Sequence, residues 1–255
     1  MLLVIDVGNT NTVIGVFDGD SLVSNWRVVT LPERTSDEYG VLIQNLYHSS
    51  KINSRDMKDI IVSCVVPPMV GIIDDLCEKY FEIKPLYVEP GIKTGMPIYY
   101  DNPKEVGADR IVNAVAAYHR KKGAHIIVDF GTATTFDYIN ESGEYMGGVI
   151  APGLMTSSEA LFAKASRLFK VELVRPKNVI GKNTINSLQS GIILGYVDMV
   201  DGLVNRITEE AGGDPWVIAT GGLAELIAGE SKTIKEVDNF LTLEGLKVIY
   251  YLNRT

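Results

Sequence analysis

The feature that most constrains the fold is an internal repeat. The segment LLVIDVGNTNT, from Leu2 to Thr12, is echoed by HIIVDFGTATT, from His125 to Thr135, so Asp6 and Asp129 stand 123 residues apart. Each copy is an apolar run, then Asp-x-Gly, then a cluster of small hydroxyl or amide residues. Each continues through a second apolar run, a polar turn and a third run, which is typical of a β-meander. Asp-x-Gly alone is a common turn, but the shared order of runs and turns favours a duplication.

Helical and strand patterns follow each meander. Apolar spacing predicts helices over 36–50, 69–81, 108–122, 184–210 and 242–252, and short strands over 60–65, 85–88 and 216–220. This alternation indicates an α/β fold with two similar domains around a central cleft. We expect an N-terminal domain over 1–120 and a C-terminal domain over 121–255. The pattern does not decide whether the last helix packs back on the first domain.

Charge and cysteine content exclude several classes of protein. The chain has 24 Lys and Arg against 32 Asp and Glu, a net charge of −8, which argues against a bulk nucleic-acid binder. Cys64 and Cys77 form neither a metal pattern nor a disulfide framework, which fits a reducing cytosol. The first residues lack a basic segment, and no apolar stretch approaches about 20 residues. We therefore expect a cytoplasmic protein that does not associate with membranes.

The segment after the first strand has the composition of a phosphate-binding loop. No Walker A motif is present, but Gly8 allows close backbone approach to a ligand, and the residues after it carry uncharged donors (Asn9, Thr10, Asn11 and Thr12). Asp6, at the strand end, is suited to hold Mg²⁺ through water while the metal neutralises phosphate. A hairpin turn capped by Asp6 is the alternative for one copy. Two copies facing each other favour a phosphate clamp.

A second candidate site lies at the start of the predicted helix over 108–122. Helix N-termini favour anions, and Gly107-Ala108-Asp109-Arg110 places both a carboxylate and a guanidinium there. Asp109 is able to accept a hydroxyl proton, and Arg110 to bind an anionic substrate. The alternatives are that Asp109 only stabilises the first helical turn and that Arg110 is a surface charge. Tyr100 is a candidate pocket wall or a packing residue.

Taken together, these residues resemble the type III pantothenate kinases, within the superfamily of actin, heat-shock chaperones and sugar kinases. The resemblance spans nearly the whole chain in order, and its pieces are Asp6–Thr12, Gly107–Arg110, Asp129–Thr135, Gly147–Gly153, Gly181–Thr184 and Thr220–Gly222. The superfamily also leads us to expect a strand, two glycines and a helix near the C-terminus, which Val217–Leu223 fits.

The resemblance implies a duplicated ribonuclease H-like, or actin-like, fold and a homodimer. It implies phosphorylation of the terminal hydroxyl of pantothenate by ATP with Mg²⁺ and a monovalent cation, potassium or ammonium, as the first step of coenzyme A synthesis. Asp109 would be the general base and Asp129 the monovalent-cation ligand. The residues implied for ATP are Asp6, Val7, Gly8, Asn9, Thr10, Asn11, Thr12, Val13 and Thr132. Those implied for pantothenate are Tyr100, Gly107, Ala108, Asp109, Arg110 and Thr184.

Two rival interpretations remain at this stage. One is a different enzyme on the same fold, such as a sugar kinase or a polyphosphate hydrolase, which a substrate screen would distinguish. The other is a non-catalytic regulator or a filament-forming ATPase. The presence of Asp6, Asp109 and Asp129 argues against a decayed regulator, and the short chain argues against a filament.

Overall fold

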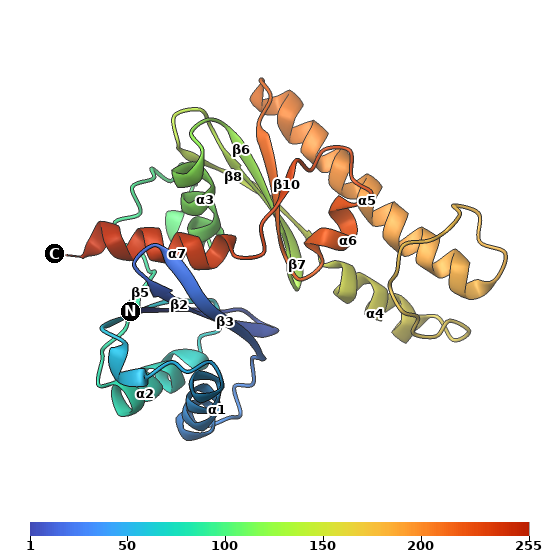
Figure 1. Ribbon diagram of the computed structural model, residues 1–255. Helices are drawn as coiled ribbons and strands as arrows, with labels where there is room; N and C mark the ends of the chain where they lie inside the picture. The colour runs from blue at the N-terminus through green and yellow to red at the C-terminus, as the bar shows by residue number, and fades with distance from the viewer. Residues whose placement is uncertain (255) are drawn as a thin grey trace. The chain divides into compact units, whose positions relative to one another are not determined.

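The computed structural model describes residues 1–254 and divides the 255-residue chain into two units (Figure 1). Unit 1 comprises Met1–Pro97, Asp101–His119 and the chain from Leu241 onward. Unit 2 comprises Ile98–Tyr100 and Arg120–Phe240. The last helix therefore belongs to unit 1, a point that the sequence pattern leaves open.

Unit 1 is built on a five-stranded sheet. Its spatial order is β3 (Ser21–Val29), β2 (Asn11–Asp18), β1 (Leu2–Val7), β4 (Asp59–Cys64) and β5 (Leu86–Tyr87). The first three strands form an antiparallel meander, and β4 and β5 join in parallel. Parallel pairing needs a crossover, which α1 (Ser36–Ser49) and α2 (Met69–Phe81) provide. The unit also contains α3 (Ala108–Arg120), except for its last residue, and α7 (Leu241–Asn253).

Unit 2 repeats this topology. Its sheet order is β8 (Tyr145–Pro152), β7 (Ala133–Ile139), β6 (His125–Phe130), β9 (Trp216–Gly221) and β10 (Glu236–Val237), again a meander followed by two parallel strands. Its helices are α4 (Leu154–Lys164), α5 (Thr184–Ala211) and α6 (Ala224–Ala228). The predicted duplication is confirmed, and the expected strand, glycine pair and helix are β9, Gly221-Gly222 and α6.

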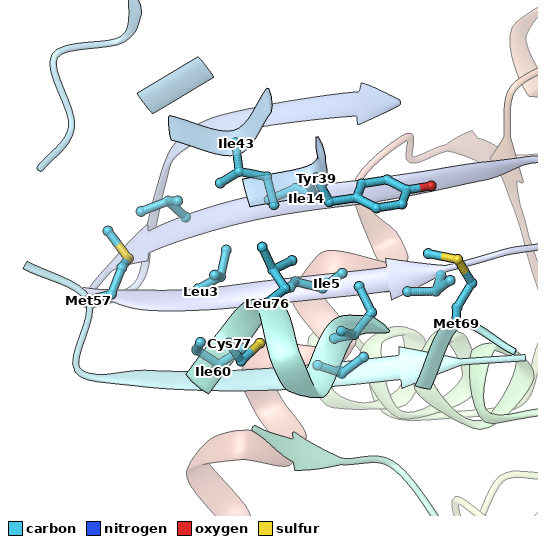
Figure 2. Packing of buried hydrophobic residues seen from close by; sticks show 14 of the residues in the cluster. Leu3, Ile5, Ile14, Tyr39, Ile43, Met57, Ile60, Met69, Leu76 and Cys77 are labelled. Atoms are coloured by element: carbon cyan, nitrogen blue, oxygen red, sulfur yellow. The ribbon is translucent and has the colours of Figure 1, made fainter. Parts of the chain in front are cut away.

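The central strand β1 is buried because both of its faces are covered. Figure 2 shows Leu3 and Ile5 among side chains of α1 and α2, and these form one apolar core. The other face meets α7, since a Cβ atom on Gly15 would lie 2.9 Å from both Leu243 Cδ1 and Val4 Cγ2. Side chains alternate along a strand, so Asp6 shares this second face with Val4.

The equivalent strand of unit 2, β6, follows the same rule. Ile126, Val128 and Phe130 pack in a core with α5 and α6. Asp129 therefore points to the opposite face, at the end of the strand. Each unit thus presents one aspartate at the carboxyl end of its central strand, on the face that does not enter these cores. No helix within residues 1–254 has both the length and the apolar content to cross a membrane.

Candidate active site

The loop between β1 and β2 is a tight turn closed at its base. The Gly8 amide donates to the Asn11 carbonyl oxygen at 3.0 Å. Asp6 is half-buried and lies in register with Val13 on β2 and Ser63 on β4. Asn9 and Thr10, at the tip, are exposed. The loop therefore has an exposed tip and a half-buried carboxylate at its base.

A residue from outside this loop fastens it. Thr30, the first residue after β3, donates its amide hydrogen to the Thr10 carbonyl oxygen at 3.0 Å and its hydroxyl to the Gly8 carbonyl oxygen at 2.8 Å. The Thr12 hydroxyl lies 2.9 Å from the Thr30 hydroxyl, and both side chains are buried. Because the single Thr30 hydroxyl proton goes to Gly8, Thr12 donates to Thr30.

The loop between β6 and β7 is one residue shorter and is closed in a similar way. The Gly131 amide donates to the Ala133 carbonyl oxygen at 3.0 Å. The carbonyl oxygen of the exposed Thr132 accepts from the Gly153 amide at 3.1 Å and from the Thr156 hydroxyl at 2.8 Å. This is the second of the two predicted loops, and it follows Asp129 as the first follows Asp6.

Asp129 lies beside the end of β9. It is in register with Thr220, and the next residue, Gly221, has φ +92°. A Cβ atom on Gly221 would lie 2.6 Å from Asp129 Oδ1 and 2.7 Å from the Phe130 carbonyl oxygen. Only glycine fits here, for reasons of both space and backbone conformation.

The start of α3 lies at the same end of unit 1 as the first loop. A Cβ atom on Gly107 would lie 3.8 Å from Val65 Cγ1, and the Val65 amide donates to the Val7 carbonyl oxygen at 3.1 Å. Val65, just after β4, is therefore a neighbour of Gly107 and is bonded to the last residue of β1. Within unit 1, the structure brings the segments 6–13 and 107–110 to one edge of the sheet.

Asp109 is held in place at the first turn of α3. Its Oδ1 accepts a hydrogen bond from the Arg110 amide at 2.8 Å. Burial raises the pKa of the Asp109 carboxyl, and this backbone hydrogen bond and the attraction of the Arg110 charge oppose the rise. A Cβ atom on Gly107 would lie 2.5 Å from Asp109 Oδ1, so the glycine leaves room for the carboxylate. Asp109 therefore also stabilises the helix start, which is compatible with a catalytic role.

Arg110 is buried, with 7% of its surface exposed, so the alternative of a simple surface charge is wrong. Its positive charge favours the ionised form of Asp109 and so lowers the pKa of that carboxyl. Burial raises the pKa of the Cys64 thiol, and the Asp6 charge adds to this rise. A thiol that stays neutral is a poor nucleophile, so we assign Cys64 no catalytic role.

The remaining predicted pantothenate residues, Tyr100 and Thr184, belong to unit 2. The segment Ile98–Tyr100 runs beside β8, where the Tyr99 amide donates to the Tyr145 carbonyl oxygen at 2.8 Å. The Tyr100 ring lies against Gly147, 3.6 Å from where a Cβ atom would stand. Thr184 is the exposed first residue of α5. The predicted pantothenate set is thus divided between the two units.

Sequence reasoning missed the two residues that fasten the loops with hydroxyl groups, Thr30 and Thr156. The repeat offered one signal, because Thr30 and Gly153 are 123 residues apart, as Asp6 and Asp129 are, and so occupy equivalent positions in the two copies.

Among residues 1–254, no group of three or more His, Cys, Asp or Glu side chains is placed to hold a metal ion.

Comparison with known proteins places the chain in a family. A sequence model of the type III pantothenate kinases matches residues 2–206. The Type III pantothenate kinase of Syntrophus aciditrophicus (strain SB) is 62% identical over 253 residues, which cover 99% of this chain and 100% of the relative. The counterpart in Geotalea daltonii is 60% identical over 254 residues, covering 100% of this chain and 99% of the relative.

A solved structure supports the fold assignment. The inorganic polyphosphate/ATP-glucomannokinase of Arthrobacter sp. strain KM superposes with a TM-score of 0.53 at 13% identity, covering 99% of both chains. At this identity the likeness shows the actin-like fold and carries no activity. The predicted fold is confirmed. The motifs, the two Asp-x-Gly loops and the identity over the full length together show that the chain belongs to the type III pantothenate kinase family.

Proposed function

We propose that this chain transfers the γ-phosphoryl group of ATP to the terminal hydroxyl of pantothenate, giving 4'-phosphopantothenate in the first step of coenzyme A synthesis. The observation that carries the proposal is the identity of 62% over the full length of a named type III pantothenate kinase. The two Asp-x-Gly loops and the carboxylate at the start of α3 supply groups of the kind that such a transfer needs.

We assign ATP binding to the segment from Asp6 to Val13 and to Thr132. Exposed loop tips with small polar residues suit phosphate oxygens, and Asn9, Thr10 and Thr132 are exposed. Mg²⁺ binds proteins through one or two carboxylates together with substrate phosphates, so one carboxylate such as Asp6 fits it through water. When bound, the ion would neutralise phosphate charge.

We assign the pantothenate site to Gly107, Ala108, Asp109 and Arg110 with Tyr100 and Thr184. Pantothenate is a monoanion, and the N-terminus of α3 is favourable for negative charge. The buried Arg110 contributes a fixed positive charge at this helix end. Tyr100, braced against Gly147, offers a flat apolar wall.

We propose that Asp109 is the general base. The hydroxyl oxygen of pantothenate bonds to the γ-phosphorus while the bond from that phosphorus to the bridging oxygen of ADP breaks. The hydroxyl proton passes to the Asp109 carboxylate. An ordinary Asp pKa of about 3.9 lies far below that of an alcohol, so this transfer comes late, as the phosphoryl group moves. Burial, which raises the pKa of Asp109, makes it a better proton acceptor.

We propose that Asp129 binds a monovalent cation, potassium or ammonium. The fit rests on the donor set, because the carboxylate oxygen and neighbouring carbonyl oxygens suit a hard cation. The Phe130 carbonyl oxygen lies 2.7 Å from the Cβ position of Gly221, and Asp129 Oδ1 lies 2.6 Å from it, so two oxygens converge beside a residue without a side chain. When bound, the ion would supply positive charge near the transferred phosphoryl group.

We also propose a homodimer in the cytoplasm. Supporting a dimer, Val179 and Ile180 of unit 2 are 73% and 81% exposed, although they are large apolar residues. The Ser190 hydroxyl donates to the Val179 carbonyl oxygen at 2.6 Å, which holds this apolar segment to α5. Sedimentation velocity tests the proposal, because wild-type protein that stays monomeric at micromolar concentration would contradict it.

The activity is tested by incubating purified protein with ATP, Mg²⁺ and pantothenate in matched potassium, ammonium and sodium chloride. Phosphorylated pantothenate is measured by mass spectrometry and ADP by a coupled assay. We expect product in potassium and ammonium and much less in sodium. Product in all three salts would remove the cation proposal and keep the kinase. Glucose, mannose and polyphosphate serve as alternative substrates, and their use in place of pantothenate would overturn the proposed function.

A further inference from the structure

We infer that Thr30, which lies outside the predicted ATP segment, is a positioning residue that holds the Gly8–Thr12 loop in the shape that receives ATP phosphates. The inference rests on the proposed role of this loop in ATP binding. It concerns a residue that would touch no ligand and would act through the loop backbone.

The first observation is that Thr30 contacts both ends and the middle of the loop. Its hydroxyl donates to the Gly8 carbonyl oxygen at 2.8 Å and lies 2.9 Å from the Thr12 hydroxyl, while its amide donates to the Thr10 carbonyl oxygen at 3.0 Å. The hydroxyls form a chain from Thr12 through Thr30 to Gly8. Such chains polarise one another and are strengthened in a buried setting.

The second observation is that these bonds engage carbonyl oxygens of the loop with donors of the protein. Three carbonyl oxygens of the segment, those of Gly8, Thr10 and Asn11, each accept a hydrogen bond from a donor of unit 1 itself. A carbonyl oxygen turned toward a phosphate would repel it. Because these three carbonyl oxygens are bonded to donors within unit 1, they are kept from facing a phosphate, and the loop is better suited to bind an anion.

The third observation is that unit 2 fastens its loop at the same point. Gly153, 123 residues after Thr30, donates its amide hydrogen to the Thr132 carbonyl oxygen at 3.1 Å. Residues beside them also bond to a tyrosine hydroxyl, because the Tyr39 hydroxyl lies 3.2 Å from Leu31 O and 3.4 Å from Val29 O, and the Tyr196 hydroxyl donates to Pro152 O at 3.1 Å. This backbone hydrogen bond to the loop is thus present in both copies of the duplicated fold.

The Thr30 hydroxyl has no equivalent at Gly153 of unit 2, where the hydroxyl that fastens the loop comes from Thr156. In unit 2 the loop is one residue shorter, and a Cβ atom on Gly153 would stand 2.4 Å from the Thr132 carbonyl oxygen. No side chain fits there. The longer loop of unit 1 leaves room for a side chain at the equivalent position, and the Thr30 hydroxyl uses this room to bridge Gly8 and Thr12.

The test compares three variants. Thr30→Val removes the hydroxyl and keeps the shape and the backbone amide, whereas Thr30→Ser keeps the hydroxyl. Tyr80→Phe is the matched control, because it removes a hydroxyl of unit 1 that donates to Asp37 Oδ1 at 2.8 Å, between α2 and α1. The dissociation constant of Mg-ATP is measured by calorimetry without pantothenate, and KM values and urea midpoints are measured alongside.

We expect Thr30→Val to weaken ATP binding about five- to tenfold, as the loss of one or two buried hydrogen bonds implies. The KM for ATP should rise by a similar factor while the KM for pantothenate stays unchanged. Thr30→Ser should bind ATP within about twofold of wild type. Tyr80→Phe should bind ATP as wild type does, whatever its effect on the urea midpoint.

Several outcomes would overturn the inference. Unchanged ATP affinity in folded Thr30→Val would do so, and so would equal weakening in Tyr80→Phe, because the effect would then be general loosening of the unit. If Thr30→Val does not fold, Thr30→Cys gives the same test with a weaker donor. Wild-type protein that binds no ATP would overturn both this inference and the proposed function. Protein that binds ATP but does not phosphorylate pantothenate would overturn only the proposed function.

Discussion

Gly221 lies against Asp129 so closely that a Cβ atom on the glycine would stand 2.6 Å from Asp129 Oδ1. The glycine also adopts φ +92°, a conformation that L residues rarely take. The two residues come from the neighbouring strands β6 and β9, so the position of the carboxylate depends on a residue distant in sequence that has no side chain.

Gly221→Ala should therefore displace Asp129. We expect a loss of about 1–3 kcal/mol in the free energy of unfolding from backbone strain, together with a higher potassium concentration for half-maximal activity. The measurements are urea unfolding and the potassium dependence of the initial rate. Gly191→Ala is the matched control, because Gly191 lies in α5 and a Cβ atom there would meet no atom within 4 Å other than the adjoining helix itself. An unchanged potassium dependence in Gly221→Ala would argue against a cation at Asp129.

Asp109→Asn should lower kcat by about 100-fold or more, the usual contribution of a general base, while the KM values stay near those of wild type. Asn keeps an oxygen that can accept from the Arg110 amide, so the start of α3 should persist. Steady-state kinetics and ATP calorimetry check this. Asp75→Asn, the same change on the exposed face of α2, should behave as wild type. Near-normal turnover in Asp109→Asn would remove Asp109 from the catalytic role.

The pH dependence of kcat/KM follows from the same carboxyl. Burial raises the pKa of Asp109, and the base must be ionised, so activity should fall as pH drops through a pKa above the ordinary Asp value of about 3.9. The residual activity of Asp109→Asn should lack this limb. An acid limb at the same pH in the variant and in wild type would assign it to another group.

The same shift has a consequence for stability. A raised pKa means that the fold prefers the protonated form, so the contribution of Asp109 to stability is present below its unfolded pKa and is lost as pH rises through its folded pKa. Asp109→Asn should therefore be at least as stable as wild type at pH 8, and its relative advantage should shrink at pH 5. Urea midpoints at the two pH values measure this. A variant clearly less stable than wild type at pH 8 would contradict the sign.

Much of the fold was predictable because the duplication is local and periodic. The apolar run before Asp6 recurs before Asp129, and both became central strands of equivalent sheets. The helix predicted over 69–81 coincides with α2. By contrast, α4 went unpredicted, because Leu154–Lys164 combines short polar residues with weak apolar spacing. The two residues of β10 form a strand only by pairing with β9.

The candidate site also has a part that the sequence predicts and a part that it does not. Asp109 and the two Asp-x-Gly loops are contiguous motifs that any reading of the sequence can find. Thr30 and Gly153 act on those loops from about twenty residues away, through backbone carbonyl groups. Such contacts leave no local pattern, since a carbonyl accepts from any donor that the tertiary structure brings near.

Gly153→Ala tests whether the second loop matters for ATP. Gly153 has φ −65° and ψ 157°, which alanine adopts readily, so the backbone conformation itself does not forbid the change. The obstacle is crowding, because the new Cβ would lie 2.4 Å from the Thr132 carbonyl oxygen and 2.5 Å from that of Gly131. The loop should move outward and lose its bond from the Gly153 amide. We expect a rise of about tenfold in the KM for ATP, as for the loss of a well-made hydrogen bond and its geometry. Gly195→Ala, at a helical position of α5 with open space, is the control. An ATP affinity equal to that of wild type would show that Thr132 is not part of the nucleotide site.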